Sequence, residues 1–333
     1  MQGCAACGPV SGIGRQDGGD EMKNALITGS NGFAGRHLAE LLVSRGWAVT
    51  GIDAAAGARA GVETRACDIC DREQVAGAVR GLAPDAVFHL AGLTVALPGQ
   101  GAEDFLRINA AGTVNLLEAG RREFPSSRFI VICSSAEYGL VAPEQVPIVE
   151  DTPLRPLTAY GLSKVSQDYA AQMFHLLHGM DVVRLRPFNH IGPGQEKPVS
   201  MAASFASQIA QIESGSHPPV IKVGNLGSVR DILDVRDVVR GYLAAAERGL
   251  KGDVYNIAGG QGSSGQSVLD HLLAMAGRRI AVEIDPARLQ PGDVPISIGS
   301  TEKFHALTGW KKEIPMEQTL ADILNHWRRR KRG

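Results

Sequence analysis

The sequence has no apolar run long enough to cross a membrane, and it has no excess of charge of either sign. A transmembrane helix needs about 20 consecutive, mostly apolar residues, and no stretch of the 333 residues approaches that length. The 34 Lys and Arg residues nearly balance the 35 Asp and Glu residues, which leaves a net charge of −1. We therefore expect neither a nucleic-acid-binding surface nor a membrane surface.

The start of the chain lacks the features of an exported segment. Residues 1–21 are rich in glycine and have no apolar centre, so they do not resemble a secretory signal. We expect them to form a disordered extension ahead of a fold that begins near residue 22. The odd number of cysteines, five, and the missing signal favour a cytoplasmic protein.

Two pairs of cysteines have the C-x-x-C spacing of zinc ligands. Cys4 and Cys7 lie in the expected extension, and Cys67 and Cys70 end a predicted strand. Ligand spacing without histidine or a folded context is weak evidence for zinc, so we assign no metal site.

The most informative feature is a glycine-rich turn between a predicted strand and a predicted helix. Residues 24–28 form an apolar run, and residues 33–43 have apolar side chains at helical spacing. Glycines let the backbone approach a pyrophosphate closely, and the start of the helix offers unpaired N–H groups to the anion. The residues of this turn predicted to bind a dinucleotide are Gly29, Asn31, Gly32, Phe33 and Gly35.

An acidic residue follows where such a fold places its ribose ligand. Asp53 ends the next apolar run, 48–53, and lies 18 residues beyond Gly35. A carboxylate at this point pairs with the ribose 2′-hydroxyl and repels a 2′-phosphate, which favours NAD(H) over NADP(H). NADP(H) stays open because Arg36 or Arg59 could accommodate the phosphate.

Further β-rich runs recur with helical patterns between them, at residues 63–69, 85–91, 128–135, 181–188 and 253–258. This alternation predicts an α/β fold: a Rossmann-type, doubly wound parallel sheet covered on both faces. Ligands of such sheets bind beyond the carboxyl ends of the strands. The candidate site residues at these ends are Asp68, Ala91, Gly92, Ser134, Ser135, Pro187 and Asn189.

The alternation weakens after about residue 190, where proline, glycine and serine become frequent. We expect residues 22–188 to form the dinucleotide-binding domain, with 230–260 returning to it. Residues 189–229 and 261–327 are expected to form a smaller C-terminal α/β substrate lobe. Residues 328–333 form a basic run, which is typical of a solvated tail.

Tyr160 and Lys164 are four residues apart, which places both side chains on one helix face. A tyrosine with an ordinary pKa of about 10 is a poor acid at neutral pH, and a neighbouring ammonium is expected to lower that pKa. Ser135 ends a predicted strand and is expected to hold a substrate oxygen. Together these groups can protonate a carbonyl oxygen as hydride reaches its carbon, or catalyse the reverse. The alternative is a surface tyrosine beside a solvated lysine.

With these motifs in place, residues 22–327 resemble the extended short-chain dehydrogenase/reductases, the NAD-dependent epimerase/dehydratase family of nucleotide-sugar enzymes. Residues 28–35 are similar to the family's glycine motif. The resemblance implies a catalytic role for Tyr160 and Lys164, which also contact the cofactor, with Ser135 as their partner. It further implies cofactor contacts from Asp68, Ile69, Leu90, Ala91, Gly92, Asn109 and Pro187. Family members commonly dimerise through the helix that carries the tyrosine, so we expect a homodimer.

Residues 186–195 are similar to the segment of the GDP-4-keto-6-deoxy-D-mannose reductases within this family. This resemblance implies reduction of the C4 ketone of a nucleotide-linked 4-keto-6-deoxyhexose, most closely GDP-4-keto-6-deoxy-D-mannose to GDP-D-rhamnose. It also implies that Asn189 and Arg230 contact the diphosphate, that Asp293 contacts the nucleoside ribose, and that Thr94 borders the sugar. An arginine fork suits phosphate, and a carboxylate suits vicinal hydroxyls. The alternatives are a turn cap for Asn189 and a surface ion pair with Asp231 for Arg230.

Glu137 bears on the type of reaction. A glutamate near this position acts as the base in the family's GDP-mannose dehydratases, whereas a reductase needs only the hydride donor, the tyrosine and the serine. We therefore include Glu137 among the catalytic and substrate-binding candidates, with loop orientation as its alternative role. A nucleotide-sugar 4-epimerase or a GDP-mannose 4,6-dehydratase remains the alternative activity. A non-catalytic NAD(P)-binding regulatory protein is the alternative outside enzymes.

Overall fold

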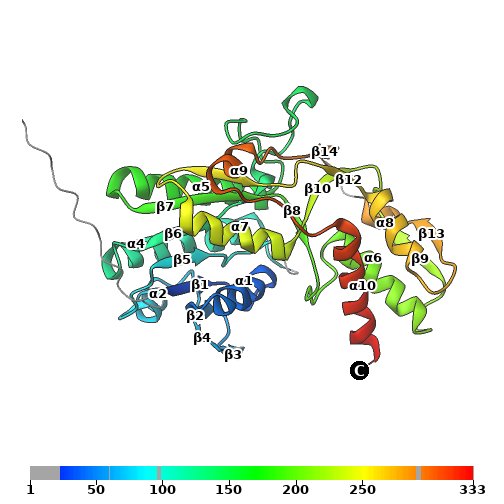
Figure 1. Cartoon of the computed structure of the whole chain (residues 1–333), viewed down its shortest axis with the longest axis horizontal. Helices are drawn as coiled ribbons and strands as arrows, with labels where there is room; N and C mark the ends of the chain where they lie inside the picture. Colours follow the sequence, from blue (N-terminus) through cyan, green and yellow to red (C-terminus); the bar gives the residue numbers. More distant parts are fainter. Residues whose placement is uncertain (1–22, 60, 96–98, 290–293, 333) are drawn as a thin grey trace, which may run out of the picture.

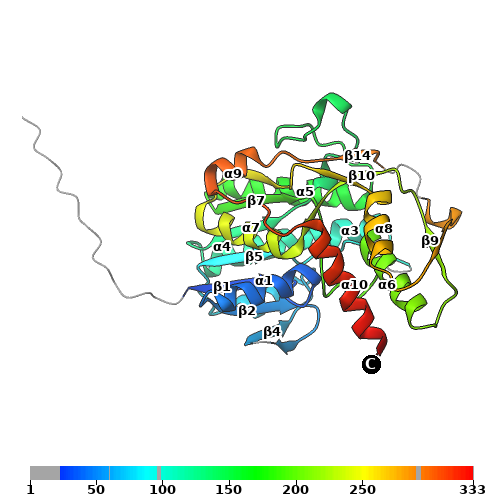
Figure 2. The ribbon, with the colours of Figure 1, turned by 45° about the vertical axis from the view of Figure 1, so that its right-hand side comes forward.

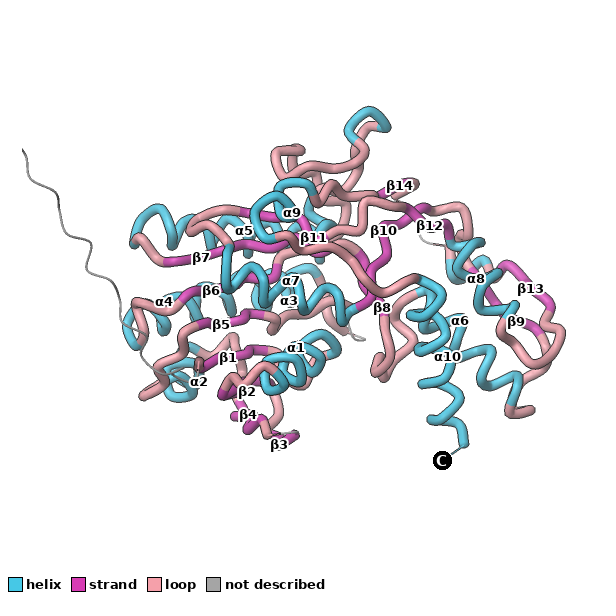
Figure 3. Tube along the Cα trace, in the orientation of Figure 1, coloured by secondary structure: helices cyan, strands magenta, loops and turns pink. Residues whose placement is uncertain are grey.

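The larger unit of the protein is an eight-stranded sheet, seen in a computed structural model that describes residues 23–59, 61–95, 99–289 and 294–332. Its strands are β1 (Asn24–Thr28), β2 (Ala48–Asp53), β3 (Gly57–Arg59), β4 (Val62–Ala66), β5 (Ala86–His89), β6 (Arg128–Ile132), β7 (Asp181–Pro187) and β11 (Val254–Ile257). The strand order is β11-β7-β6-β5-β1-β2-β4-β3, and Figure 3 shows these strands stacked edge to edge. Only the pairing of β3 with β4 in this sheet is antiparallel. The predicted parallel sheet is confirmed.

Helices cover both faces of the sheet because alternate side chains of each strand point to opposite faces. In β1, Ala25 and Ile27 join the core beneath α1 (Phe33–Ser44) and α7 (Val235–Arg248). Leu26 joins the opposite core, beneath α2 (Arg72–Val79), α4 (Gly112–Glu123) and α5 (Ala159–His178). Both cores are built of buried aliphatic and aromatic side chains, as expected for strands with apolar residues on both faces.

The order in which successive strands are added to the sheet reverses at β1, which pairs with β2 on one side and with β5 on the other. Thr28 lies opposite Ile52 in β2 and His89 in β5. Its hydroxyl is 2.7 Å from Nδ1 of His89, whose other ring nitrogen is 2.7 Å from the Thr113 hydroxyl. Burial lowers the pKa of His89 to about 3, so the ring is neutral. Such a switch point is where open α/β sheets bind their ligands.

A smaller lobe stands beside the carboxyl ends of these strands (Figures 1 and 2). Its first sheet contains β8 (Asn189–Ile191), β10 (Val229–Asp234), β12 (Gly262–Ser264) and β14 (Ile296–Ser297), and its second pairs β9 (Val220–Val223) with β13 (Ala281–Ile284). The helices α6 (Met201–Glu213), α8 (Gly265–Ala274) and α10 (Met316–Arg332) enclose a separate core that includes Phe205, Leu269 and Leu324.

The border between the two units differs from the expected one. Strand β10 belongs to the small lobe, so the return to the large sheet begins with α7 rather than at residue 230. Helix α9 (Glu302–Thr308) was expected in the small lobe, but Phe304 and the following Trp310 pack in the core of the large unit. Both differences arise from long-range packing, which local patterns do not encode.

The basic run at the end of the chain is helical, because α10 continues through it to Arg332, and Arg329, Arg330 and Lys331 are exposed. The Arg328 guanidinium pairs with the Glu213 carboxylate of α6, with a 2.7 Å contact. Residues 1–21, expected to be an extension, lie outside the described residues.

Candidate active site

The predicted glycine-rich turn joins β1 to α1, and its geometry requires glycine. Gly29 has a φ of 74°, in the left-handed region that favours glycine. A Cβ on Gly35 would lie 2.1 Å from the carbonyl oxygen of Gly29, so a side chain there would collide with the turn. No side chain caps α1 at Gly32. The first N–H groups of α1 and its positive end therefore suit a pyrophosphate, and the turn fits a dinucleotide.

Asp53 lies at the end of β2 beside this turn, as predicted. Its two carboxylate oxygens accept the N–H of Asn31 at 2.9 Å and the N–H of Ala54 at 2.8 Å. These bonds fix a negative charge where the ribose ligand is expected. Arg36 pairs with Glu196 and donates to the Gly194 carbonyl, so its guanidinium is engaged away from Asp53. The side chain of Arg59 lies outside the described residues.

Asn109 joins the end of β5 to α5. Its Oδ1 accepts the N–H of Leu93 at 2.6 Å, and its Nδ2 donates to the Leu93 carbonyl and to the Ser163 hydroxyl. These bonds hold the segment after β5, where Leu90, Ala91 and Gly92 were predicted to meet the cofactor. A Cβ on Gly92 would lie 3.6 Å from Nζ of Lys164. The structure thus brings the strand end and the predicted catalytic lysine together.

The other predicted cofactor residues lie at the ends of β4 and β7. Asp68 follows β4, and its carboxylate accepts the N–H of Cys70 at 2.9 Å. Ile69 is only 8% exposed and packs beneath α4, so its side chain belongs to the core. Pro187 is buried as the last residue of β7.

Tyr160 and Lys164 lie one turn apart at the start of α5, with Nζ 6.0 Å from the centroid of the phenol ring. The expected lowering of the tyrosine pKa is wrong for this arrangement. Burial raises the pKa of Tyr160 to about 12, and the neighbouring Ser134 side chain opposes that rise. The ammonium instead donates to the Ile132 carbonyl at 2.9 Å and to Oε1 of Gln167 at 2.6 Å.

Two serines follow β6. Ser134 is in an extended conformation, with φ −163° and ψ 147°, it is 9% exposed, and its hydroxyl accepts the N–H of Ala136 at 3.1 Å. The predicted Ser135 is half-buried and begins the short 3₁₀ helix η2 (Ser135–Glu137). Successive side chains of an extended chain point to opposite sides, so we expect only one of the two serines to face a substrate beside Tyr160.

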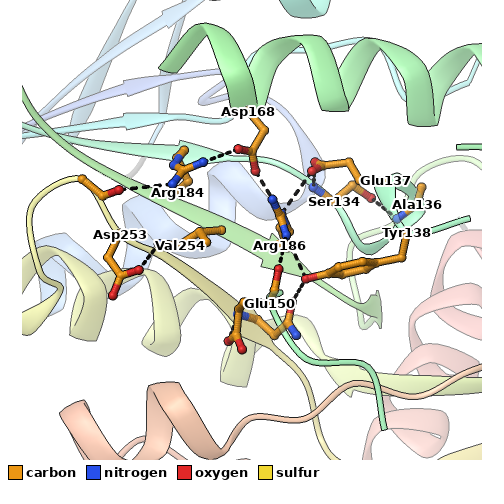
Figure 4. Close-up of polar contacts among 12 residues, drawn as sticks. Ser134, Ala136, Glu137, Tyr138, Glu150, Asp168, Arg184, Arg186, Asp253 and Val254 are labelled. Carbon is orange, nitrogen blue, oxygen red and sulfur yellow. Dashed lines mark hydrogen bonds and ion pairs between the residues drawn. The ribbon is translucent and has the colours of Figure 1, made fainter. Parts of the chain in front are cut away.

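Glu137, predicted among the catalytic and substrate-binding residues, is fully buried, and its carboxylate is engaged within the protein. Its Oε1 accepts the N–H of Ser134 at 2.8 Å, and its Oε2 lies 3.2 Å from Nε of Arg186 (Figure 4). Arg186 in turn donates to Asp168 of α5 at 2.9 Å. The alternative role, a carboxylate that orients a loop, fits this geometry. Sequence reasoning missed Arg186 and Asp168, although Asp168 lies one helical turn beyond Lys164.

The predicted diphosphate ligands lie on neighbouring strands of the small lobe. Exposed Asn189 in β8 pairs with Ile232 in β10, so Arg230, two residues earlier, is on the same face. Asp231 points to the other face, where its buried carboxylate accepts the N–H groups of Gly259, Gly260 and Gly299. The alternative surface ion pair between Arg230 and Asp231 is therefore wrong.

The remaining substrate candidates are less constrained by the structure. Thr94 is exposed on the segment after β5. Asp293 lies outside the described residues.

The helices of the described residues include none with the length and apolarity that a membrane span requires.

Comparison with known proteins agrees with this site. The NAD dependent epimerase/dehydratase family matches residues 25–258, and the chain belongs to this family. It is an enzyme class that works with a nicotinamide cofactor, as the glycine-rich turn predicted.

Individual relatives indicate which enzymes of this family the chain resembles. The chain is 34% identical to GDP-6-deoxy-D-mannose reductase of Pseudomonas aeruginosa, over 92% of this chain and 98% of the relative. A solved structure of RMD from Pseudomonas aeruginosa complexed with NADPH is similar with a TM-score of 0.81 at 32% identity, over 93% and 100% of the two chains. UDP-glucose 4-epimerase of Thermus thermophilus, solved in complex with NAD, has a TM-score of 0.81 at 29% identity, over 92% and 99%.

Proposed function

We propose that this protein reduces the C4 ketone of a nucleotide-linked 4-keto-6-deoxyhexose, with GDP-4-keto-6-deoxy-D-mannose as substrate and GDP-D-rhamnose as product. The observation that carries the proposal is the Tyr160–Lys164 pair at the start of α5, with Glu137 withdrawn into the protein. The similarity to GDP-6-deoxy-D-mannose reductase over nearly the whole chain supports the choice of nucleotide and sugar.

The chemistry of the site follows from its protonation states. Because burial raises the pKa of Tyr160, the phenol holds its proton at neutral pH and can donate it to a carbonyl oxygen. The Ser135 hydroxyl, at the start of η2, would give that oxygen a second partner as negative charge develops on it. Bound NAD(P)H supplies the hydride to the carbonyl carbon. Gly29, Gly32 and the start of α1 would hold its pyrophosphate.

The position of Glu137 favours a reductase over a 4,6-dehydratase. A dehydratase must remove the C5 proton of the hexose, and the carboxylate suggested for that task is paired with Arg186 and fully buried. A ketone reduction needs no such base.

We assign NADH as the preferred cofactor because of Asp53. Its carboxylate, held by two backbone N–H groups, would accept the ribose 2′-hydroxyl and repel a 2′-phosphate. Arg36 is engaged with Glu196 and Gly194. The similar Pseudomonas aeruginosa protein was solved with NADPH, so the preference of this chain for NADH needs a direct measurement.

Asn189 and Arg230 would bind the diphosphate from the shared face of β8 and β10. Arg230 supplies a planar guanidinium that matches phosphate oxygens, and Asn189 supplies an amide donor. Asp293 would contact the nucleoside ribose, and Thr94 would border the hexose. These assignments place the nucleotide on the small lobe and the ketone toward Tyr160.

The substrate test compares three reactions with the same enzyme. GDP-4-keto-6-deoxy-D-mannose with NADH or NADPH should consume reduced cofactor and yield GDP-D-rhamnose. GDP-mannose alone and UDP-glucose alone should give no product. Product from GDP-mannose without added reduced cofactor would establish a dehydratase, and UDP-galactose from UDP-glucose would establish a 4-epimerase.

We also propose that two copies of the chain pair through α5. Leu162, Tyr169, Met173 and Leu176 recur on one face of this helix and are between 42% and 71% exposed. A continuous exposed apolar stripe of this kind is typical of an interface. Light scattering should give the mass of a dimer, and Leu176→Lys should shift it toward the monomer.

A further inference from the structure

The ammonium of Lys164 is held inside the protein by two uncharged acceptors. Its Nζ donates to the Ile132 carbonyl at the end of β6, at 2.9 Å, and to Oε1 of Gln167, one turn further along α5, at 2.6 Å. Lys164 is only 5% exposed, and Gln167 is fully buried. The position of the ammonium is therefore set by groups within the protein rather than by solvent.

These two acceptors account for two of the three N–H donors of the ammonium. The described residues provide no further hydrogen bond to Nζ. A Cβ on Gly92 would lie 3.6 Å from Nζ, so the ammonium lies beside the strand end after β5, where the cofactor is expected. The third N–H is thus left for a ligand at the strand ends.

The orientation of the Gln167 amide follows from its partner. An ammonium only donates, so the amide must turn its oxygen to Lys164. Its Nε2 is then buried and has no hydrogen-bond partner among the residues that the structure describes. A buried donor without a partner destabilises a fold, so stability alone does not account for a glutamine here.

The carboxylate next to Gln167 is engaged elsewhere. Asp168 accepts from Arg184 at 2.5 Å and from Arg186 at 2.9 Å, both of β7. Lys164 therefore bonds to an amide oxygen, which directs the ammonium without neutralising its charge.

We propose that Gln167 is a positioning residue for Lys164: its amide oxygen, together with the Ile132 carbonyl, directs the third N–H of the ammonium to the cofactor site. This inference rests on the proposed role of Lys164 beside Tyr160. Because Gln167 is fully buried, it acts through Lys164 and not on a ligand.

The test is a double-mutant cycle that combines Gln167→Leu, which removes the acceptor, with Lys164→Met, which removes the ammonium. The control is Gln172→Leu, because Gln172 is a half-buried glutamine of the same helix with no hydrogen bond to Lys164. Thermal unfolding shows whether each variant is folded. Gln167→Met also lacks an acceptor and replaces Gln167→Leu if that variant does not fold.

Binding of NADH, followed by fluorescence without any sugar, is the first measurement. A hydrogen bond to a charged group is worth about 10- to 100-fold in an equilibrium constant, so we expect Gln167→Leu to raise the Kd for NADH by about 10-fold. Lys164→Met should raise it at least as much, and Gln167→Leu should add nothing in that background. An equal increase in both backgrounds, an unchanged Kd in Gln167→Leu, or an equal increase in the control would overturn the proposal.

The second measurement observes the ammonium itself in the enzyme without cofactor. A buried, hydrogen-bonded ammonium exchanges its protons slowly, so nitrogen NMR of isotope-labelled lysine should show a signal that Lys164→Met removes. Gln167→Leu should shift or abolish this signal, and Gln172→Leu should leave it in place. A signal that Gln167→Leu leaves unmoved contradicts the inference.

The outcomes separate this inference from the proposed function. If the cycle shows coupling while the wild-type enzyme reduces no 4-keto sugar, the positioning role stands and the proposed function fails. If the enzyme reduces the 4-keto sugar while the effects of the two substitutions on the Kd are independent, the proposed function stands and the positioning role fails.

Discussion

Replacing each of two adjacent serines by alanine tests which one works with Tyr160. The Ser134 hydroxyl is nearly buried and accepts the N–H of Ala136, whereas the half-buried Ser135 is the first residue of η2. We expect Ser135→Ala to lower kcat for ketone reduction much more than Ser134→Ala, because the Ser134 hydroxyl is already engaged within the protein. The comparison is internally matched because both changes remove one hydroxyl from neighbouring positions.

The size of the effect follows from the contacts that are lost. A hydroxyl that stabilises a developing oxyanion is worth about 10²- to 10³-fold in kcat, or about 3 to 4 kcal/mol. Ser134→Ala instead removes the 3.1 Å cap bond to the Ala136 N–H, which should cost about 1 kcal/mol of the free energy of unfolding. The Ser135 variant should therefore lose mainly activity, and the Ser134 variant mainly stability.

The assay follows oxidation of NADH or NADPH with GDP-4-keto-6-deoxy-D-mannose, and urea unfolding gives the stability of each variant. Ser135→Ala should keep its affinity for NADH, because the glycine-rich turn that fits the pyrophosphate is untouched. A Ser134→Ala enzyme with the larger kcat defect would refute the assignment of Ser135. Equal, small defects in both variants would show that neither serine assists proton transfer.

Three further predictions follow from the same structure. Asp168→Asn should lower the free energy of unfolding by about 3–5 kcal/mol in urea denaturation, because it leaves the buried guanidinium groups of Arg184 and Arg186 short of an anion; a loss below about 1 kcal/mol would contradict that view. Asp53→Ala should raise kcat/KM for NADPH relative to NADH, and an unchanged ratio means that Asp53 does not select the cofactor. Burial and Asp168 raise the pKa of Glu137 from 4.5 to about 8, so the folded state binds an extra proton between these values and wild-type stability should fall as pH rises through that window. In Glu137→Gln, the free energy of unfolding measured with urea should change less between pH 5 and pH 8 than in the wild-type protein. An unaltered slope would show that Glu137 is not the group that causes the decline.

Much of the fold could be predicted from residue patterns because its determinants are local. The apolar runs that became β1, β2, β5, β6, β7 and β11 are each bounded by turn residues, and the glycines at 29, 32 and 35 have one compatible conformation between a strand and a helix. The spacing of Tyr160 and Lys164 also needs only a helix to place both on one face. These local features are enough to indicate the family.

Local patterns failed where packing between distant segments decides the outcome. The assignment of β10 to the small lobe depends on its pairing with β8, β12 and β14, and the position of α9 depends on Phe304 entering the main core. The basic residues after 327 continue a helix because α10 packs against α6, where Arg328 finds Glu213.

Residue patterns close together in the chain account for the doubly wound sheet, the dinucleotide turn and the Tyr160–Lys164 pair. The tertiary structure is needed to see that Glu137 turns inward. That burial depends on the Arg186 guanidinium of β7, which pairs with Glu137 and also with Asp168 of α5. A buried carboxylate requires such a partner, and a linear sequence does not show which partner lies within reach.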